Sequence, residues 1–373
     1  MADRYLGESI PKLGFGYMRL PRIAGSEEFD LPQICNMVDT FLKNGYTYFD
    51  TAFVYQGSEE AMHKTLITRH PRENYQIASK LNLMFAKNKA EMKEQFETTL
   101  SRLGTSYLDF YLLHGLGGQS IKKAEDLGGW EFMKELKDAG KIKHICISFH
   151  GTPEELEELL TNHPETEFVQ LQINYLDWES TNTQSRRMYE IAQAHNTPVT
   201  IMEPLLGGNL ASDTMPWSEG FKKADPEASV SSWAFRFLAE LDGLVTILSG
   251  MSTYDQLVDN VNTFNNMKPL TDADRELIKS TAAAIKAIPG VPCTSCRYCV
   301  EQCPSKINIP ALMGLYTTYL MYNNAGTLKH SYGFMTRGAG MAKDCVGCRI
   351  CESHCPQHIE IADILEKLSP LVD

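Results

Sequence analysis

Short apolar runs alternate with longer segments of helical spacing between residues 12 and 265. The segments between the runs, such as AEMKEQFETTLSRL and PEELEELLTN, have the spacing of amphipathic helices. Eight strands that alternate with helices over about 250 residues are typical of a (β/α)8 TIM barrel in the α/β class. An open doubly wound sheet is the alternative, but no G-x-G-x-x-G follows the first run. The runs that predict strands are LGFG, YTYFD, YQIASK, LDFYLLH, IKHICIS, FVQLQIN, PVTIME and LVTILSG.

Helix boundaries in the pattern support this division. Asn88 and Thr152 are placed to cap helices, and Gly104 is placed to end one. A final helix is expected from Thr271 to about residue 288, where Pro289-Gly290 interrupts the pattern. We therefore expect a barrel domain over residues 1–288 and a small, mainly helical domain over 289–373. Within the latter, residues 310–335 predict one amphipathic helix and a loop.

The second domain is marked by cysteines, because eight of the ten in the chain lie there in two equal runs. Each run has the spacing C-x2-C-x2-C-x3-C-P, which ligates [4Fe-4S] clusters in bacterial ferredoxins. In such pairs the fourth cysteine of a run serves the other cluster. The expected cofactors are therefore two [4Fe-4S] clusters, with one ligand set of Cys293, Cys296, Cys299 and Cys355 and another of Cys345, Cys348, Cys351 and Cys303.

Zinc and disulfides are the alternatives for these cysteines. Paired C-x2-C units also bind structural zinc, although three evenly spaced cysteines before a Cys-Pro fit zinc poorly. Disulfides belong to oxidising compartments, and the sequence MADRYLGESIPKLG lacks the charged and apolar regions of a signal peptide. We expect a cytoplasmic protein with reduced thiols, in which Cys35 and Cys146 are small apolar core residues.

The overall composition narrows the choice of partners. The chain has 373 residues, is 43% hydrophobic and 22% charged, and carries a net charge of −12. The negative charge disfavours nucleic acid and anionic membrane surfaces, and no run approaches the roughly 18 apolar residues of a membrane span. We therefore expect a small-molecule substrate, with neither a nucleic acid nor a membrane as partner.

Four polar residues follow predicted strands at the end where a TIM barrel holds its active site. Asp50 ends YTYFD, Tyr55 follows in the next loop, Lys80 ends YQIASK and His114 ends LDFYLLH. A carbonyl that accepts hydride needs a proton, and a tyrosine is a poor acid at neutral pH unless a cation stabilises its phenolate. Lys80 is the candidate cation, Asp50 would hold it, and His114 would donate a hydrogen bond to the substrate oxygen. Taken singly, each residue is more simply explained by packing or capping; together they indicate one site.

The segments GYTYFDTAFVYQGSEE, LDFYLLH and KELKDAGKIKHICIS, with a third strand that ends in lysine, resemble the aldo/keto reductase superfamily. With its cysteine-rich tail, the chain looks like the subgroup that carries a C-terminal ferredoxin-like domain. The resemblance implies an Asp, Tyr, Lys, His catalytic tetrad and an NADP or NAD cofactor. It also implies cofactor contacts at Ser148, Gln170, Asn174, Met202, Gly207, Gly250, Ser252, Gln256 and Asn260.

The sequence departs from the family pattern at two places. Met202-Glu203-Pro204 stands where many members carry an aromatic residue that stacks on the nicotinamide, although a thioether can also cover a ring. No basic residue lies between Arg236 and Lys268, where a cation for a 2′-phosphate is usual. The preference between NADP and NAD therefore stays open.

The expected function joins two kinds of redox chemistry. We expect NAD(P)H-dependent reduction of a carbonyl, or the reverse oxidation of an alcohol, with the clusters relaying electrons. A ferredoxin or flavoprotein is the expected electron partner, since a nicotinamide transfers two electrons together and a cluster one at a time. Two alternatives remain open at this stage. In the first alternative, the clusters are structural or redox-sensing and the barrel acts alone. In the second, the chain is an electron-transfer or regulatory protein with a non-catalytic barrel.

Overall fold

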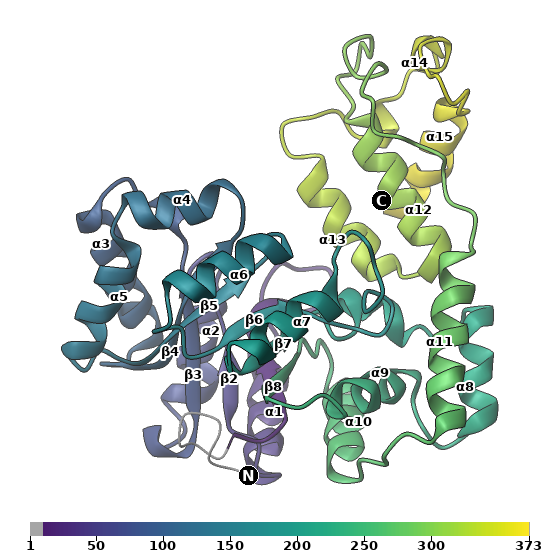
Figure 1. Cartoon of the computed structure of the whole chain (residues 1–373). Helices are drawn as coiled ribbons and strands as arrows, with labels where there is room; N and C mark the ends of the chain where they lie inside the picture. The colour runs from purple at the N-terminus through teal and green to yellow at the C-terminus, as the bar shows by residue number, and fades with distance from the viewer. Residues whose placement is uncertain (1–9, 373) are drawn as a thin grey trace. The chain divides into compact units, whose positions relative to one another are not determined.

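A closed barrel of eight parallel strands forms the first part of the molecule (Figure 1). The structure is a computed structural model and describes residues 10–372. Each strand pairs with its neighbours in sequence, and β1 pairs with β8, which confirms the predicted barrel. The strands are β1 (Leu13–Gly16), β2 (Tyr48–Asp50), β3 (Gln76–Leu81), β4 (Leu108–Leu116), β5 (Ile142–Phe149), β6 (Val169–Gln172), β7 (Val199–Met202) and β8 (Leu244–Ser249).

The barrel strands are buried on both faces, which explains why they read as continuous apolar runs. All six residues of β8 are buried, for example. One buried cluster brings together residues of several strands, among them Tyr48, Phe110 and Val245. Phe15 and Phe49 pack against Phe41 of the first helix, with ring centroids 5.4 and 5.3 Å away. This packing holds the strand ends that carry the site.

Helices connect the strands, and their caps agree with the sequence. The Asn88 side chain accepts a hydrogen bond from the backbone N–H of Glu91, and Thr152 and Glu155 form a capping box. Gly104 ends its helix at a φ of 67°. The helices are α1 (Leu31–Lys43), α2 (Ser58–Met62), α3 (Lys89–Leu103), α4 (Gln119–Asp126), α5 (Gly129–Asp138), α6 (Pro153–Asn162), α7 (Ser185–Ala194), α9 (Val230–Ala239) and α10 (Tyr254–Asn265).

The chain divides into two compact units. The first contains the described residues up to Pro204 together with Ser232–Leu270, and the second contains Leu205–Ser231 together with the described residues from Thr271 onward. Residues 205–231 thus pack with the C-terminal helices, and the expected domain boundary after residue 288 stays a prediction. The helices of the second unit are α8 (Glu219–Ala224), α11 (Asp272–Lys286), α12 (Ile309–Tyr322), α13 (Ala325–Met335), α14 (Ile350–Ser353) and α15 (Ile361–Val372).

Residues 310–335 form most of two helices, so the expectation of one helix and a loop was wrong. The reason is a pair of asparagines: Asn323 ends α12 in the left-handed conformation at a φ of 49°, and the Asn324 side chain caps α13 by accepting from the Thr327 N–H. Both helices and α15 pack around one core that includes Leu312, Leu328 and Leu365. The two cysteine-containing segments, one before α12 and one after α13, pack against this helical core.

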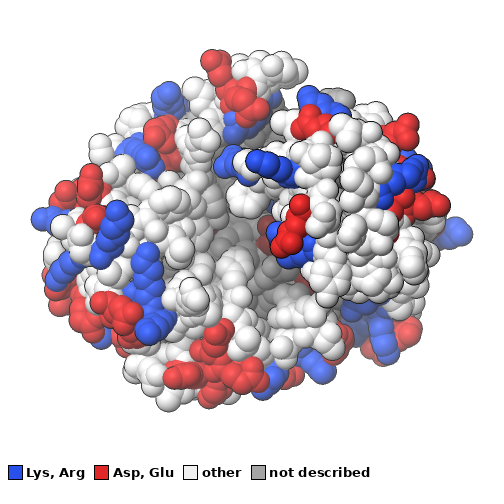
Figure 2. Space-filling view, turned by 90° about the horizontal axis from the view of Figure 1, so that it is seen from above, with Lys and Arg blue, Asp and Glu red and all other residues white. Residues whose placement is uncertain are grey.

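Charged side chains of both signs are interspersed over the face seen in Figure 2, with wide neutral areas between them. No described helix is both long enough and apolar enough to cross a membrane.

Candidate active site and cysteine cavities

The carboxyl ends of β2, β3 and β4 bring four predicted catalytic residues together. Asp50 is the last residue of β2, Lys80 is the next-to-last residue of β3, and His114 lies near the end of β4. Tyr55 comes from the loop between β2 and α2, half-buried beside them. The ring of Tyr55 meets the ring of His114 edge to face, with centroids 6.0 Å apart.

Lys80 lies at the centre of this group and is fully buried. Its Nζ donates to Asp50 Oδ1 at 2.6 Å and to the carbonyl of Thr51 at 2.7 Å. The same Nζ lies 5.0 Å from the centre of the Tyr55 ring. Burial alone would lower the pKa of Lys80, but Asp50 and Tyr55 raise it, so this side chain stays a cation at neutral pH.

Opposing effects act on the phenol of Tyr55. Burial raises the pKa of Tyr55 above its ordinary value, Lys80 lowers it, and the carboxylates of Asp50 and Glu203 raise it. At neutral pH the phenol therefore carries its proton, while Lys80 is the group that favours its loss. A tyrosine in this state can act as an acid toward a developing alkoxide.

His114 is neutral in this environment. Burial, followed by the positive charge of Lys80 and the proximity of His150, lowers the pKa of His114 to about 3. Its Nδ1 is buried and has no hydrogen-bond partner among the described residues. A buried N–H without an acceptor is costly, so the proton is best placed on Nε2, where His114 becomes a hydrogen-bond donor.

Three of the expected nicotinamide contacts lie close together on β5, β6 and β7. Ser148 and Gln170 are register partners, and Gln170 Nε2 donates to the Met202 sulfur at 3.6 Å. The Oε1 atom of Gln170 is buried without a partner among the described residues. This free acceptor fits a carboxamide N–H. Asn174 differs, because its amide is used internally by Leu176, Asp177 and Glu203.

The other expected cofactor residues divide between the two units. Just after Gly250, the backbone N–H of Ser252 donates a hydrogen bond to Gln256 Oε1 at 2.7 Å. Asn260 donates to Ser249 Oγ at 2.7 Å and so fastens α10 to β8. Gly207 belongs to the second unit, where its carbonyl accepts a hydrogen bond from Thr327 Oγ1 at 2.8 Å.

The sequence did not single out Glu203 as a site residue. It follows β7 directly, and its carboxylate adds to the effect of burial that raises the pKa of Tyr55. Burial lowers the pKa of His150, and the Glu203 carboxylate partly opposes that effect. The available signal was an acidic residue at the end of a predicted strand, directly before a proline. The backbone carbonyl of Thr51 accepts a hydrogen bond from Lys80 Nζ, and the sequence does not predict this contact because it involves no side chain of Thr51.

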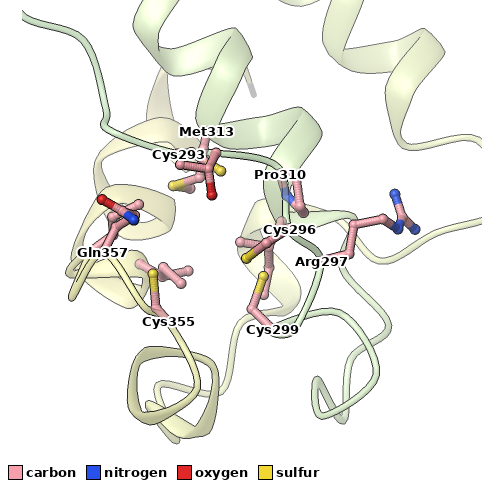
Figure 3. A pocket seen from close by; sticks show the side chains of 12 residues that line it. Cys293, Cys296, Arg297, Cys299, Pro310, Met313, Cys355 and Gln357 are labelled. Atoms are coloured by element: carbon pink, nitrogen blue, oxygen red, sulfur yellow. The ribbon is translucent and has the colours of Figure 1, made fainter.

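The eight tail cysteines line two separate cavities in the second unit. Cys293, Cys296 and Cys299 face one cavity with Cys355 from the other run, as Figure 3 shows. The second cavity is lined by Cys345, Cys348, Cys351 and Cys303. The structure thus groups the cysteines in the two crossed sets that the spacing indicates.

The spacing of these thiols bears on what they can bind. All ten cysteines are free thiols. Among the described residues, no three histidine, cysteine or acidic side chains approach closely enough to hold one metal ion. Four cysteines around each cavity match the four thiolates that a [4Fe-4S] cluster takes. Burial raises the pKa of Cys299, and burial with the Glu352 carboxylate raises that of Cys351 to about 11.

Comparison with known proteins agrees with both parts of the chain. Residues 12–283 match the aldo/keto reductase family, and residues 292–360 match a 4Fe-4S dicluster domain. A protein of Glycine max named probable aldo-keto reductase 1 is 30% identical over 169 residues, which cover 43% of this chain and 47% of that protein. The chain thus spans about half the length of that relative.

Solved structures show the same barrel. The holo form of an aldo-keto reductase from Bacillus halodurans has 26% identity and a TM-score of 0.60, covering 74% of this chain and 93% of that one. An aldo-keto reductase of Klebsiella pneumoniae, solved in complex with NADPH, has 21% identity and a TM-score of 0.60, covering 73% and 90%. The second likeness supports the fold alone. Because the family match extends over most of the sequence, the chain belongs to the aldo/keto reductase family of oxidoreductases, and its barrel is joined to a 4Fe-4S dicluster domain.

Proposed function

We propose that the barrel reduces a small-molecule carbonyl with a nicotinamide nucleotide, or oxidises the corresponding alcohol in reverse. The observation that carries this proposal is the cluster of buried Asp50 and Lys80 with half-buried Tyr55 and His114 at one end of the barrel. The bound nucleotide supplies or accepts the hydride. The four side chains manage the proton and the charge on the substrate oxygen.

Tyr55 gives its proton to the oxygen as negative charge develops there. The fixed ammonium of Lys80 stabilises the phenolate that results, and Asp50 with the Thr51 carbonyl keeps that ammonium in place. Neutral His114 donates a hydrogen bond from Nε2 to the same oxygen, which orients the carbonyl before the transfer. In the oxidative direction the phenolate takes the proton back.

The nucleotide is proposed to lie along the carboxyl ends of β5 to β8. Ser148 and Gln170 would hold the carboxamide, since Gln170 Oε1 is a buried acceptor without a partner among the described residues, and Met202 would cover the ring. Gly250, Ser252, Gln256 and Asn260 are the proposed contacts for the remainder, with Asn174 acting through the turn it holds. The Klebsiella pneumoniae relative, solved with NADPH, is the reason to test NADPH first.

Two [4Fe-4S] clusters are proposed in the two cysteine cavities, held by the crossed sets. Their proposed role is to exchange single electrons with a ferredoxin or a flavoprotein. A flavin in such a partner accepts two electrons as hydride and releases them singly, which would connect the clusters to nicotinamide chemistry. The alternative is that the clusters are structural or redox-sensing while the barrel works alone.

Replacement of Tyr55 by Phe tests the catalytic assignment. Tyr55→Phe removes the proton donor and keeps the ring, so kcat should fall at least about a hundredfold, the contribution of one general acid. The affinity for NADPH, measured by fluorescence, should stay within about twofold. Equal turnover in wild-type and variant protein would refute the assignment. Removal of the clusters in parallel separates the two roles: an unchanged rate of carbonyl reduction favours clusters that do not take part in that step.

A further inference from the structure

Arg19 and Glu203 form an ion pair at the end of the barrel that carries the catalytic group. Arg19 follows β1, at the end of a short 3-10 turn (Tyr17–Arg19), and Glu203 follows β7. Arg19 Nη2 lies 3.7 Å from Glu203 Oε1, and the two side chains are 26% and 32% exposed. The pair is therefore partly desolvated but open to an incoming ligand.

The backbone and stem of Arg19 are fixed. Ser252 Oγ donates to the Arg19 carbonyl at 2.7 Å, which fastens the β1 loop to the loop after β8. The Arg19 side chain runs over Gly250, where a Cβ would meet its Cβ, Cγ and Cδ atoms at 3.5 to 3.6 Å. The stem of Arg19 therefore packs on the loop after β8, which contains Gly250 and Ser252.

The guanidinium of Arg19 uses little of its hydrogen-bonding capacity. A separation of 3.7 Å exceeds the range of an N–H···O bond, and no described residue accepts a hydrogen bond from this guanidinium. Arg102 in the same barrel contrasts with it, because Arg102 Nη1 donates to Glu59 Oε2 at 3.2 Å and to the Phe53 carbonyl at 3.1 Å. Arg102 is a structural cation, whereas Arg19 has donors to offer.

Glu203 is held where it faces the catalytic group. Its φ is 55°, in the left-handed region that favours glycine, and Asn174 Nδ2 donates to its carbonyl at 3.2 Å. Its negative charge acts on both Tyr55 and His150. A substrate or nucleotide that carries an anionic group therefore meets a carboxylate and a cation next to each other.

We propose that Arg19 is the anion-binding residue of the active-site mouth and that Glu203 is its internal competitor. The ligand chemistry is an anionic oxygen group, either a phosphate of the nucleotide or a carboxylate on the substrate. In the free protein Glu203 forms a weak ion pair with Arg19. When the anion binds, it accepts hydrogen bonds from the Arg19 guanidinium and displaces the Glu203 carboxylate, which is then exposed to solvent. The proposal rests on the proposed function only in placing nucleotide and substrate at this mouth.

Binding measurements on Arg19→Gln, Glu203→Gln and the double variant test this proposal. The probes are NADPH and NADH, followed by fluorescence, and the substrate pair 4-carboxybenzaldehyde and its methyl ester, followed by KM. Arg19→Gln should lower the affinity for the anionic ligand about ten- to a hundredfold. Glu203→Gln should raise the affinity for the same ligand several-fold, and this increase should be absent in the double variant. Arg22→Gln, at an exposed arginine paired with Glu27, is the matched control.

The two sources of the anion give different results. A change in nucleotide Kd with both aldehydes unaffected identifies a phosphate, and a change in KM for the carboxylate alone identifies the substrate. The proposal is overturned if Arg19→Gln alters neither quantity, or if Glu203→Gln has the same effect with and without Arg19. Nucleotide binding repeated in the Tyr55→Phe background keeps this outcome separate from the catalytic assignment, because it requires no turnover. Circular dichroism establishes that each variant is folded.

Discussion

Replacement of Lys80 by Met removes the buried cation and leaves its partner carboxylate in the barrel. Lys80 Nζ donates to Asp50 at 2.6 Å and to Thr51 at 2.7 Å, and neither charged side chain is more than slightly exposed. The second oxygen of Asp50 has no hydrogen-bond partner among the described residues. After the replacement Asp50 therefore loses its counter-ion and keeps no described hydrogen bond to its side chain.

Removal of one member of a buried ion pair lowers the free energy of unfolding by about 3–5 kcal/mol. That range corresponds to roughly two to four orders of magnitude in the unfolding equilibrium. Asp50→Asn combined with Lys80→Met leaves two neutral groups, so the double variant should be about 2 kcal/mol more stable than Lys80→Met alone.

Urea unfolding of anaerobically prepared protein, followed by circular dichroism, measures these differences. A second measurement uses pH. With Lys80 absent, the pKa of Asp50 in the folded state lies above its value of about 3.9 in the unfolded chain. The folded state then binds more protons, so the deficit of Lys80→Met should shrink when the pH falls from 8 to 5. A deficit below about 1 kcal/mol at pH 8, or one that grows on acidification, would show that Asp50 and Lys80 are not a buried pair.

Three further predictions concern other parts of the chain. Because the pKa of His114 is lowered to about 3, its imidazole stays neutral above about pH 4. The pH profile of kcat between pH 5 and 8 should therefore have the same shape in wild type and in His114→Gln, with lower values in the variant. A titration near pH 6.5 that is found only in wild type would contradict this. Cys296→Ser should lower the iron content of anaerobically purified protein by about half or more, whereas Cys35→Ser should leave it unchanged, and equal iron in both variants would exclude Cys296 as a ligand. Gly104→Ala should destabilise the protein more than Gly140→Ala in urea unfolding. Both residues have a φ near 66°, which makes alanine unfavourable by about 1–2 kcal/mol, but only at Gly104 would a Cβ lie 2.4 Å from His63 Nδ1; equal effects would rule out that contact.

The barrel was predictable because its strands are short, buried and separated by capped helices. The Asn88 and Thr152 caps and the Gly104 stop act within a few residues, so the chain carries their signal locally. The packing of residues 205–231 with the C-terminal helices was not predictable in this way. It depends on contacts such as the Trp217 Nε1 bond to the Met321 carbonyl at 3.2 Å, between residues far apart in sequence.

The same distinction applies to the candidate site. Asp50, Lys80 and His114 were recognisable because each ends a predicted strand, and the strand ends of a barrel meet at one edge. The use of Asn174 was not visible, since a turn residue and a ligand contact look alike in a sequence. The pairing of Arg19 with Glu203 was hidden for a related reason: it joins β1 to β7, and such a pairing follows from closure of the barrel.

The crossed arrangement of the cysteines has a consequence for how the protein is made. Each cavity draws three thiols from one run and its fourth from the other, with α12 and α13 between the runs. Neither set is complete until Cys345 to Cys355 have been synthesised and folded back onto Cys293 to Cys303. Loading is therefore coupled to folding of the tail, and a nascent chain that ends after α13 holds no finished site. Completion of the two sites therefore becomes a single event that waits for the second cysteine run, Cys345 to Cys355.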